Sequence, residues 1–191
     1  MILPDPPWPA YQHPGEFSRL WDLAAENGTR TVVEIGSLYG GTLWWFAQLP
    51  HIETLISVDL VLDYEPMRPG IEQARDEWPT RIAPLVPEFR AHHADSHSPD
   101  TVLRVQNQLA GRPVDLLFID GDHTADGVRT DWVLWSPLVR PGGLIALHDT
   151  VPNPPRHEPG VVALAAEMRR QYPSIEIFYP DGGAGICVFV Q

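Results

Sequence analysis

Two apolar runs flanking a helical segment constrain the fold of this chain more than any other feature. The run 114–119 ends in the sequence DGDH, and the run 144–147 ends in His148 and Asp149. Apolar runs of this length are typical of adjacent parallel strands buried on both faces of a sheet. The segment between them carries an apolar stripe at helical spacing, namely Val128, Trp132 and Trp135. We expect strand, helix, Pro-Gly-Gly turn and strand here.

Strands and helices alternate along the rest of the sequence. Further strands are expected at 31–36, 54–60, 89–94, 174–179 and 185–190, the last two joined by PDGGA as a hairpin. Helices are expected at 16–26, from Gly40 onward, and at 71–78, 100–110 and 160–172. This order predicts an α/β, Rossmann-like, doubly wound and mostly parallel sheet, with one antiparallel strand from the hairpin. A chain of 191 residues is most simply one domain, 1–191.

Two proline-rich stretches lie outside this alternation. Residues 1–15 carry Trp8 and Tyr11 and are interpreted as an ordered arm on the surface, with a flap over the functional site or a dimer contact as alternatives. The loop 150–160 carries Arg156, His157 and Glu158. Rigid loop structure is the simpler interpretation for these three residues, and the wall of a ligand pocket is the alternative.

Composition restricts the partners and the compartment. A net charge of −12 and a sequence without lysine argue against binding to nucleic acid or to anionic membranes. The N-terminus lacks the basic and apolar pattern of a signal peptide, and no apolar run reaches the length of a membrane span. The single cysteine, Cys187, lies in the apolar sequence GICVFV and is interpreted as a buried apolar residue. We therefore expect a cytoplasmic protein.

An acidic residue lies at or near the carboxyl end of each of the first five predicted strands, at Glu34, Asp59, Asp95, Asp120 and Asp149. Ligands bind beyond these strand ends in open parallel sheets. Polar loops begin at strand ends in any case, but five acids along one edge favour a ligand site. A dinucleotide pyrophosphate requires a helix N-terminus without a facing carboxylate, and the first turn reads GSLYGG rather than GxGxxG. The pattern favours a ligand with a cationic head, such as an α-ammonium and sulfonium.

The first three strand ends suit different parts of such a ligand. Gly36, Gly40 and Gly41 allow close backbone approach, although a plain strand-to-helix turn explains them equally. Asp59 lies at the end of the second strand, where a ribose diol is usually held. Asp95 and Ser96, after the third strand, are placed to bond an adenine amino group. His92, His93 and His97 are interpreted as surface and cofactor-loop residues rather than a metal cluster.

Four segments carry a family resemblance: VVEIGSLYGGT at 32–42, ISVDL at 56–60, HADSH at 93–97, and LLFIDGDHTADGVRTDWVLWSPLVRPGGLIALHD at 116–149. Through them the chain resembles the class I S-adenosylmethionine-dependent methyltransferases. The branch that it resembles most contains cephalosporin-hydroxylase-like proteins and macrolide or sugar O-methyltransferases. This resemblance implies a seven-stranded sheet with an antiparallel last strand. It also implies cofactor contacts at Glu34, Gly36, Ser37, Asp59, Asp95 and Ser96, with Gly40 and Asp120 as further candidates.

The last two strand ends carry the residues expected to react. Methyl transfer to a hydroxyl requires a divalent cation or a general base that lowers the proton affinity of the oxygen. Asp120 and Asp149 are expected to converge on one ion, with His148 or Asp122 as a further ligand, and such an oxygen-rich set favours Mg²⁺ or Mn²⁺. Metal-dependent relatives are similar in having a histidine three positions after the first acid. His123 is therefore the proposed general base.

Simpler roles exist for these residues. Asp120 has two alternatives to metal binding, a helix cap and a contact to the cofactor, and His123 is alternatively a loop histidine bonded to a backbone carbonyl. The sequence predicts an S-adenosylmethionine-dependent O-methyltransferase for a hydroxyl of a small molecule, with or without a divalent cation. A non-catalytic S-adenosylmethionine-binding partner or scaffold protein is one rival, and a nicotinamide-dependent oxidoreductase is another. The short chain lacks a cap domain, so we also expect a homo-oligomer.

Overall fold

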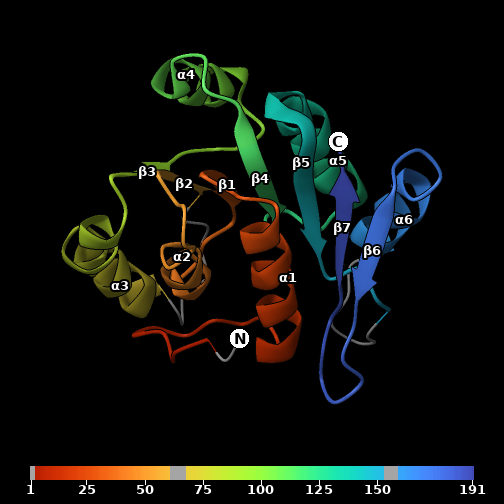
Figure 1. Cartoon of the computed structure of the whole chain (residues 1–191), viewed down its shortest axis with the longest axis horizontal. Helices are drawn as coiled ribbons and strands as arrows, with labels where there is room; N and C mark the ends of the chain where they lie inside the picture. The colour runs from red at the N-terminus through yellow and green to blue at the C-terminus, as the bar shows by residue number, and fades with distance from the viewer. Residues whose placement is uncertain (1–2, 61–67, 153–158) are drawn as a thin grey trace.

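A seven-stranded sheet forms the centre of the computed structural model, which describes residues 3–60, 68–152 and 159–191. In this part of the chain the strand order is β3-β2-β1-β4-β5-β7-β6 (Figure 1). The strands are β1 (Thr31–Ile35), β2 (Thr54–Asp59), β3 (Glu88–His93), β4 (Val114–Ile119), β5 (Val139–His148), β6 (Ser174–Ile177) and β7 (Ile186–Val190). The first five run parallel, and β7 pairs antiparallel with both β5 and β6. The predicted doubly wound α/β fold is confirmed.

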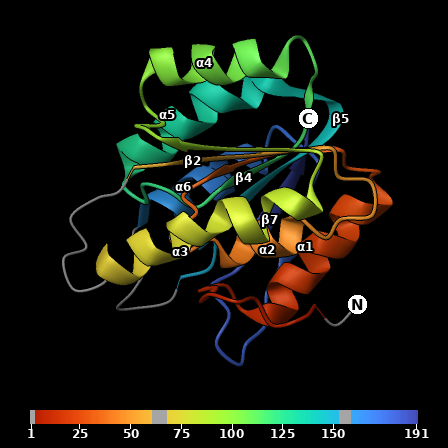
Figure 2. The same cartoon turned by 90° about the vertical axis from the view of Figure 1, so that its left-hand side faces the viewer.

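Helices cover both faces of the sheet and create two separate cores. They are α1 (Pro14–Glu26), α2 (Gly41–Phe46), α3 (Arg68–Arg81), α4 (Pro99–Leu109), α5 (Ala125–Trp135) and α6 (Pro159–Met168), with short 3₁₀ helices at Ala83–Leu85 and Ser136–Leu138. Figure 2 shows α1, α2 and α3 on one side of the sheet and α4 and α5 on the other. Successive strand side chains point to opposite faces. Val32 therefore packs in the α1–α3 core, and Val33 in the core of α4, α5 and α6.

The Pro-Gly-Gly segment before β5 is where the sequence prediction was wrong. These residues lie inside β5, which begins at Val139 rather than Leu144. The backbone N–H of Gly142 donates to the carbonyl of Gln191, and the N–H of Gln191 donates to the carbonyl of Gly143. The segment is thus paired with the end of the chain instead of turning. The parallel register with β4 shifts between Val114 and Leu116 to accommodate it.

The link between β6 and β7 is longer than the tight hairpin that the sequence indicated. The strands end at Ile177 and begin at Ile186, so residues 178–185 form the loop. Glu16 of α1 explains this path, because its buried carboxylate accepts hydrogen bonds from the backbone N–H groups of Tyr179, Ala184 and Gly185. These N–H groups bond a side chain instead of a strand. Helix α6 also ends early, at Met168 instead of Tyr172.

The N-terminal arm, residues 3–13, packs on α2. Trp8 is buried in the core and meets Trp44 edge-to-face. The indole N–H of Trp45 donates to the carbonyl of Pro4 at 2.8 Å. A Cβ on Gly41 would lie 2.6 Å from the carbonyl oxygen of Pro9, so a glycine is required where the arm crosses the helix.

None of the helices in the described ranges is both long enough and apolar enough to cross a bilayer.

Candidate active site at the carboxyl edge of the sheet

The carboxyl ends of β1, β2, β4 and β5 meet at one edge, where a cavity of about 930 Å³ opens. Six of the predicted cofactor-binding residues line this cavity, namely Gly36, Ser37, Asp59, Asp95, Ser96 and Asp120. His123, His148 and Asp149, which were predicted to act in catalysis or metal binding, line it as well. Glu34 and Gly40 do not line the cavity. The structure therefore brings most of the predicted site into one space.

Gly36 joins the ends of β1 and β4 at the floor of the cavity. Its φ of +84° lies in the left-handed region, and a Cβ there would sit 2.1 Å from the carbonyl oxygen of Asp120. The backbone N–H of Asp120 donates to the carbonyl of Ile35 at 2.8 Å, which holds the two strands together at this point. Only glycine fits this position.

Asp59 shapes the turn that follows β1. One carboxylate oxygen accepts hydrogen bonds from the backbone N–H groups of Ser37 and Leu38, each at 2.7 Å. The other accepts a hydrogen bond from Arg75 of α3 at 2.5 Å. Arg75 also donates to the Leu38 carbonyl and contacts His93 of β3. Sequence reasoning missed Arg75, because an arginine in an amphipathic helix carries no signal of its buried partner.

Glu34 lies behind this turn, fully buried, instead of facing the cavity. Its carboxylate accepts hydrogen bonds from the hydroxyls of Ser37 and Thr42. Burial disfavours the charged form and, despite those hydrogen bonds, raises the pKa of Glu34 to about 8. Gly40, at the start of α2, has a φ of +90° and faces Trp78, whose Nε1 would lie 2.4 Å from an added Cβ. Both residues thus support the turn from behind.

Glu34→Gln should make the stability of the protein less sensitive to pH. A folded-state pKa near 8, against 4.5 for the free side chain, means that the folded chain holds an extra proton between these values. Stability therefore falls as pH rises through this window in the wild type, and the neutral amide removes the loss. The melting temperature of the variant should match the wild type at about pH 4.5 and exceed it by several degrees at about pH 8.5. Equal pH profiles of melting temperature would contradict a neutral Glu34.

The loop after β3 places Asp95, Ser96 and His97 on the cavity wall. The indole N–H of Trp135 donates to the Ser96 carbonyl at 3.0 Å, and Asp95 accepts from the backbone N–H of His97 at 2.9 Å. His97 also lies 3.5 Å from the fully buried Asp131, whose pKa is raised to about 6 by burial. His97 is a cavity-loop residue, as predicted.

His92, by contrast, was expected on the surface and is buried. Its Nε2 atom pairs with the amide oxygen of Gln108 on α4 at 2.7 Å, so it joins β3 to the helix that packs on it.

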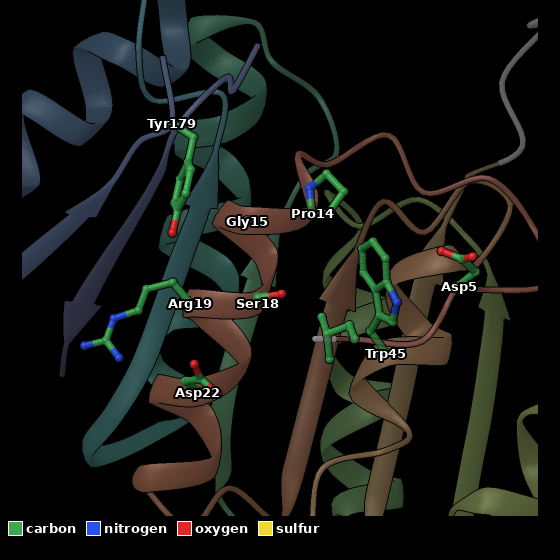
Figure 3. Close-up of a pocket in the computed structure, with 9 residues that line it drawn as sticks. Asp5, Pro14, Gly15, Ser18, Arg19, Asp22, Trp45 and Tyr179 are labelled. Atoms are coloured by element: carbon green, nitrogen blue, oxygen red, sulfur yellow. The ribbon is translucent and has the colours of Figure 1, made fainter. Parts of the chain in front are cut away.

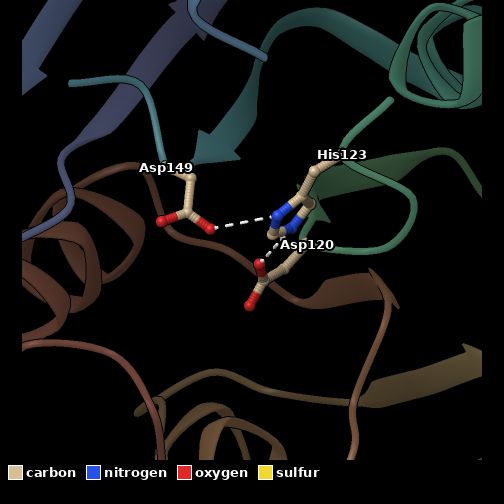
Figure 4. Close-up of side chains that lie close together, drawn as sticks. All are labelled: Asp120, His123 and Asp149. Atoms are coloured by element: carbon tan, nitrogen blue, oxygen red, sulfur yellow. Dashed lines mark hydrogen bonds and ion pairs between the residues drawn. The ribbon is translucent and has the colours of Figure 1, made fainter. Parts of the chain in front are cut away.

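The ends of β4 and β5 bring two carboxylates and two imidazoles together. His123 contacts Asp120 through Nε2 at 3.2 Å and Asp149 through Nδ1 at 3.3 Å (Figure 4). The Nδ1 atom of His148 lies 3.1 Å from Asp120 and 3.2 Å from Asp149. Asp149 adopts a φ of +58°, an uncommon backbone conformation that directs its side chain into the cluster. We call Asp120, His123, His148 and Asp149 the strand-end cluster.

Each imidazole of the strand-end cluster lies against both carboxylates, and these contacts shift the pKa values of the cluster. Burial disfavours the imidazolium of His148, but Asp120 and Asp149 outweigh it and raise the pKa of His148 to about 10. Its hydrogen bond with Asp120 likewise raises the pKa of His123. The two imidazoles hold the pKa of Asp120 well below its usual range, although burial acts in the opposite direction. A bound cation competes with protons for the cluster, so its affinity depends on pH.

The donor set fits a divalent cation. One ligand atom from each of Asp120, His123 and Asp149 lies within 4.8 Å of the others. The ligands predicted from the sequence were Asp120, His148 and Asp149, so the two sets differ in their histidine. The two imidazoles differ in solvent exposure: the side chain of His123 is 28% exposed and that of His148 is 7% exposed. Asp122, the alternative ligand, accepts a hydrogen bond from the backbone N–H of Thr124 instead. Thr124 also caps α5, so Asp120 does not cap that helix.

The N-terminal arm forms part of the cavity wall through residues 9–13. Gln12 is buried, and its amide Nε2 donates to Asp120 Oδ2 at 2.6 Å. Gln12 was not predicted from the sequence, because a polar residue in a proline-rich segment has no expected partner. A second, smaller hollow of about 440 Å³ lies beside Pro14 and Gly15, with Trp45, Tyr179, Arg19 and Asp22 around it (Figure 3). Residues Arg156, His157 and Glu158, considered as a pocket wall, fall outside the described residues.

Solved structures of similar fold include several O-methyltransferases. A protein assigned as a caffeoyl-CoA O-methyltransferase from Staphylococcus aureus has a TM-score of 0.68 and 15% identity, covering 96% of this chain and 85% of that one. An O-methyltransferase from Bacillus cereus, in complex with S-adenosylhomocysteine, has a TM-score of 0.62 and 22% identity, covering 96% and 84%. TomG from Streptomyces achromogenes, in complex with S-adenosylmethionine, has a TM-score of 0.62 and 19% identity, covering 93% and 80%. Identities this low show a shared fold.

A curated relative and a family model match the sequence itself. An uncharacterised protein of Acanthamoeba polyphaga mimivirus is 29% identical over 129 residues, which are 65% of this chain and 53% of the relative. The chain thus spans about half the length of that relative. The family model described as a methyltransferase domain matches residues 33–150, from β1 to the residue after the strand-end cluster. This match covers more than half of the chain, and the chain therefore belongs to the methyltransferase-domain family.

Proposed function

We propose that the protein transfers the methyl group of S-adenosylmethionine to a hydroxyl of a small molecule. One observation carries this proposal: a single cavity is lined by the glycine turn after β1, by Asp59 and Asp95, and by the strand-end cluster. Its volume of about 930 Å³ lies within the range of small-molecule sites. Similar folds in complex with S-adenosylhomocysteine and S-adenosylmethionine, and the family match, support the choice of cofactor.

The cofactor is expected to lie along the ends of β1, β2 and β3. Gly36 and Ser37 offer close backbone approach, Asp59 suits the ribose diol, and Asp95 with Ser96 suits the adenine amino group. Glu34 and Gly40 act indirectly, by fixing the turn. Acidic side chains outnumber arginines on the cavity wall, where Arg75 pairs with Asp59. The remaining negative charge favours a cationic ligand such as a sulfonium.

The acceptor is expected at the strand-end cluster. Its hydroxyl oxygen donates an electron pair to the methyl carbon as the carbon–sulfur bond breaks, the bonding electrons pass to sulfur, and the hydroxyl proton goes to a base. His123 is our candidate base, because it is the more exposed of the two imidazoles. Asp120 and Asp149 would hold Mg²⁺ or Mn²⁺ together with His148, whose Nδ1 atom lies 3.1 and 3.2 Å from the two carboxylates, which leaves His123 to take the proton. When bound, the ion would stabilise the developing alkoxide.

Labelled S-adenosylmethionine and a panel of hydroxyl acceptors test the proposal. Catechols, sugars and polyketide alcohols should be offered with Mn²⁺ or Mg²⁺ and again after treatment with a chelator. Transfer of label to at least one acceptor supports the proposed activity, and its loss on chelation supports the cation. Binding of the cofactor without transfer to any acceptor favours a non-catalytic partner or scaffold protein. A homo-oligomer and a cytoplasmic location remain predictions.

Asp95→Ala should weaken binding of S-adenosylhomocysteine about 10-fold, because a hydrogen bond to the adenine amino group is worth about 1.4 kcal/mol. Isothermal titration calorimetry measures the dissociation constant. Asp100→Ala is the matched control, since Asp100 is exposed in the first turn of α4. Equal affinities of the Asp95 variant and the wild type would exclude Asp95 from the cofactor contacts.

A further inference from the structure

The arm reaches the reacting end of the cavity through one side chain. Gln12 lies next to His13, which caps the N-terminus of α1 and stacks on Tyr179 at 5.2 Å between ring centroids. The side chain of Gln12 is turned inward, leaving the residue 8% exposed. Its amide meets Asp120, which is 108 positions away in the sequence.

The two oxygens of Asp120 have different partners. Oδ1 faces the imidazoles of His123 and His148, at 3.2 and 3.1 Å. Oδ2 faces away from them and accepts the hydrogen bond from Gln12 at 2.6 Å. The amide therefore fixes the rotation of the carboxylate, so that Oδ1 points at the rest of the strand-end cluster. Hydrogen bonds of this kind orient the carboxylates that bind metal ions, and their loss typically lowers metal affinity 10- to 100-fold.

We propose that Gln12 is a positioning residue for a divalent cation, acting through Asp120, and that cation binding and docking of the arm are therefore coupled. This inference rests on the proposed cation site. Residues 3–8 of the arm have anchors of their own, because Trp8 donates to Glu77 at 3.3 Å and Trp45 donates to the Pro4 carbonyl. Removal of the amide should therefore leave residues 3–8 in place and affect only the orientation of the carboxylate and the docking of the segment around Gln12.

Gln12→Met tests this role, since methionine is similar in shape but cannot donate a hydrogen bond. Titration with Mn²⁺ alone, followed by electron paramagnetic resonance, should show an affinity about 10- to 100-fold weaker than that of the wild type. The affinity of the variant for S-adenosylhomocysteine should stay within about twofold of the wild-type value. A general loosening of the fold would lower that affinity as well. Gln48→Met is the matched control, because its amide bonds the Trp44 carbonyl at the end of α2.

The coupling has a second readout in hydrogen exchange. By thermodynamic reciprocity, a side chain that strengthens cation binding is itself held more firmly when the cation is bound. Amides of residues 10–13 should exchange more slowly with Mn²⁺ in the wild type, and the ion should have no such effect in the Gln12→Met variant.

The outcomes separate the inference from the proposed function. If the wild type binds Mn²⁺ and Gln12→Met binds it equally well, Gln12 has no positioning role, although the cation site stands. If the wild type binds no Mn²⁺, the inference and the cation proposal both fail. Methyl transfer is judged separately, by binding of S-adenosylhomocysteine and by the acceptor panel.

Discussion

Asp120→Asn should abolish binding of Mn²⁺ and lower methyl transfer at least about 100-fold. Asp120 is the group on which the strand-end cluster converges, since His123, His148 and Gln12 all bond its carboxylate. The amide keeps the shape of the side chain but removes the charge that binds the ion and balances His148. Metal titration and transfer of labelled methyl groups measure the two effects.

Asp122→Asn is the control for this variant. Asp122 also follows β4, but its carboxylate bonds the backbone of Thr124 instead of the cluster. We expect the control to bind Mn²⁺ and transfer methyl groups nearly as the wild type does. Full activity in Asp120→Asn would remove the cation site at Asp120 from the proposed chemistry.

Gly36→Ala should lower the free energy of unfolding by about 3 kcal/mol or more and abolish binding of S-adenosylhomocysteine. The new Cβ would sit 2.1 Å from the carbonyl oxygen of Asp120, a backbone atom that cannot move without separating β1 from β4. The positive φ adds strain of its own. Urea denaturation and calorimetry measure the two quantities.

Gly28→Ala isolates the backbone contribution. Gly28 has a similar φ of +67°, but no atom lies within 4 Å of an added Cβ. Its destabilisation should therefore stay near 1 kcal/mol, and cofactor binding should not change. Equal effects of the two substitutions would mean that the close approach of β1 and β4 is unimportant.

Local patterns predicted the fold because β1, β2 and β4 are short apolar runs with parallel neighbours on both sides. The run at Leu116 and the run at Leu144 pair directly, and their polar ends meet at one edge as expected. Prediction failed where a distant partner decides the conformation. The Pro-Gly-Gly segment is strand because it pairs with Gln191, and the loop 178–185 follows the carboxylate of Glu16.

The same distinction separates the predicted site residues from the missed ones. Asp59, Asp120 and Asp149 were found because each lies at or just after a strand end, where topology alone brings side chains together. Gln12 and Arg75 were not found, since each reaches the cavity from a segment whose sequence does not indicate its partner. Glu34 was predicted to contact the cofactor, but its side chain is buried behind the turn. Its partners there, Ser37 and Thr42, could not be inferred from the strand pattern.

Calorimetric titration of S-adenosylhomocysteine into the wild-type protein is the most direct test of the central claim, that the carboxyl edge of the sheet holds this cofactor. We predict binding at a single site, retained in Gln12→Met and lost in Gly36→Ala. Absence of binding to the wild type, or binding of a nicotinamide dinucleotide in its place, would contradict the account.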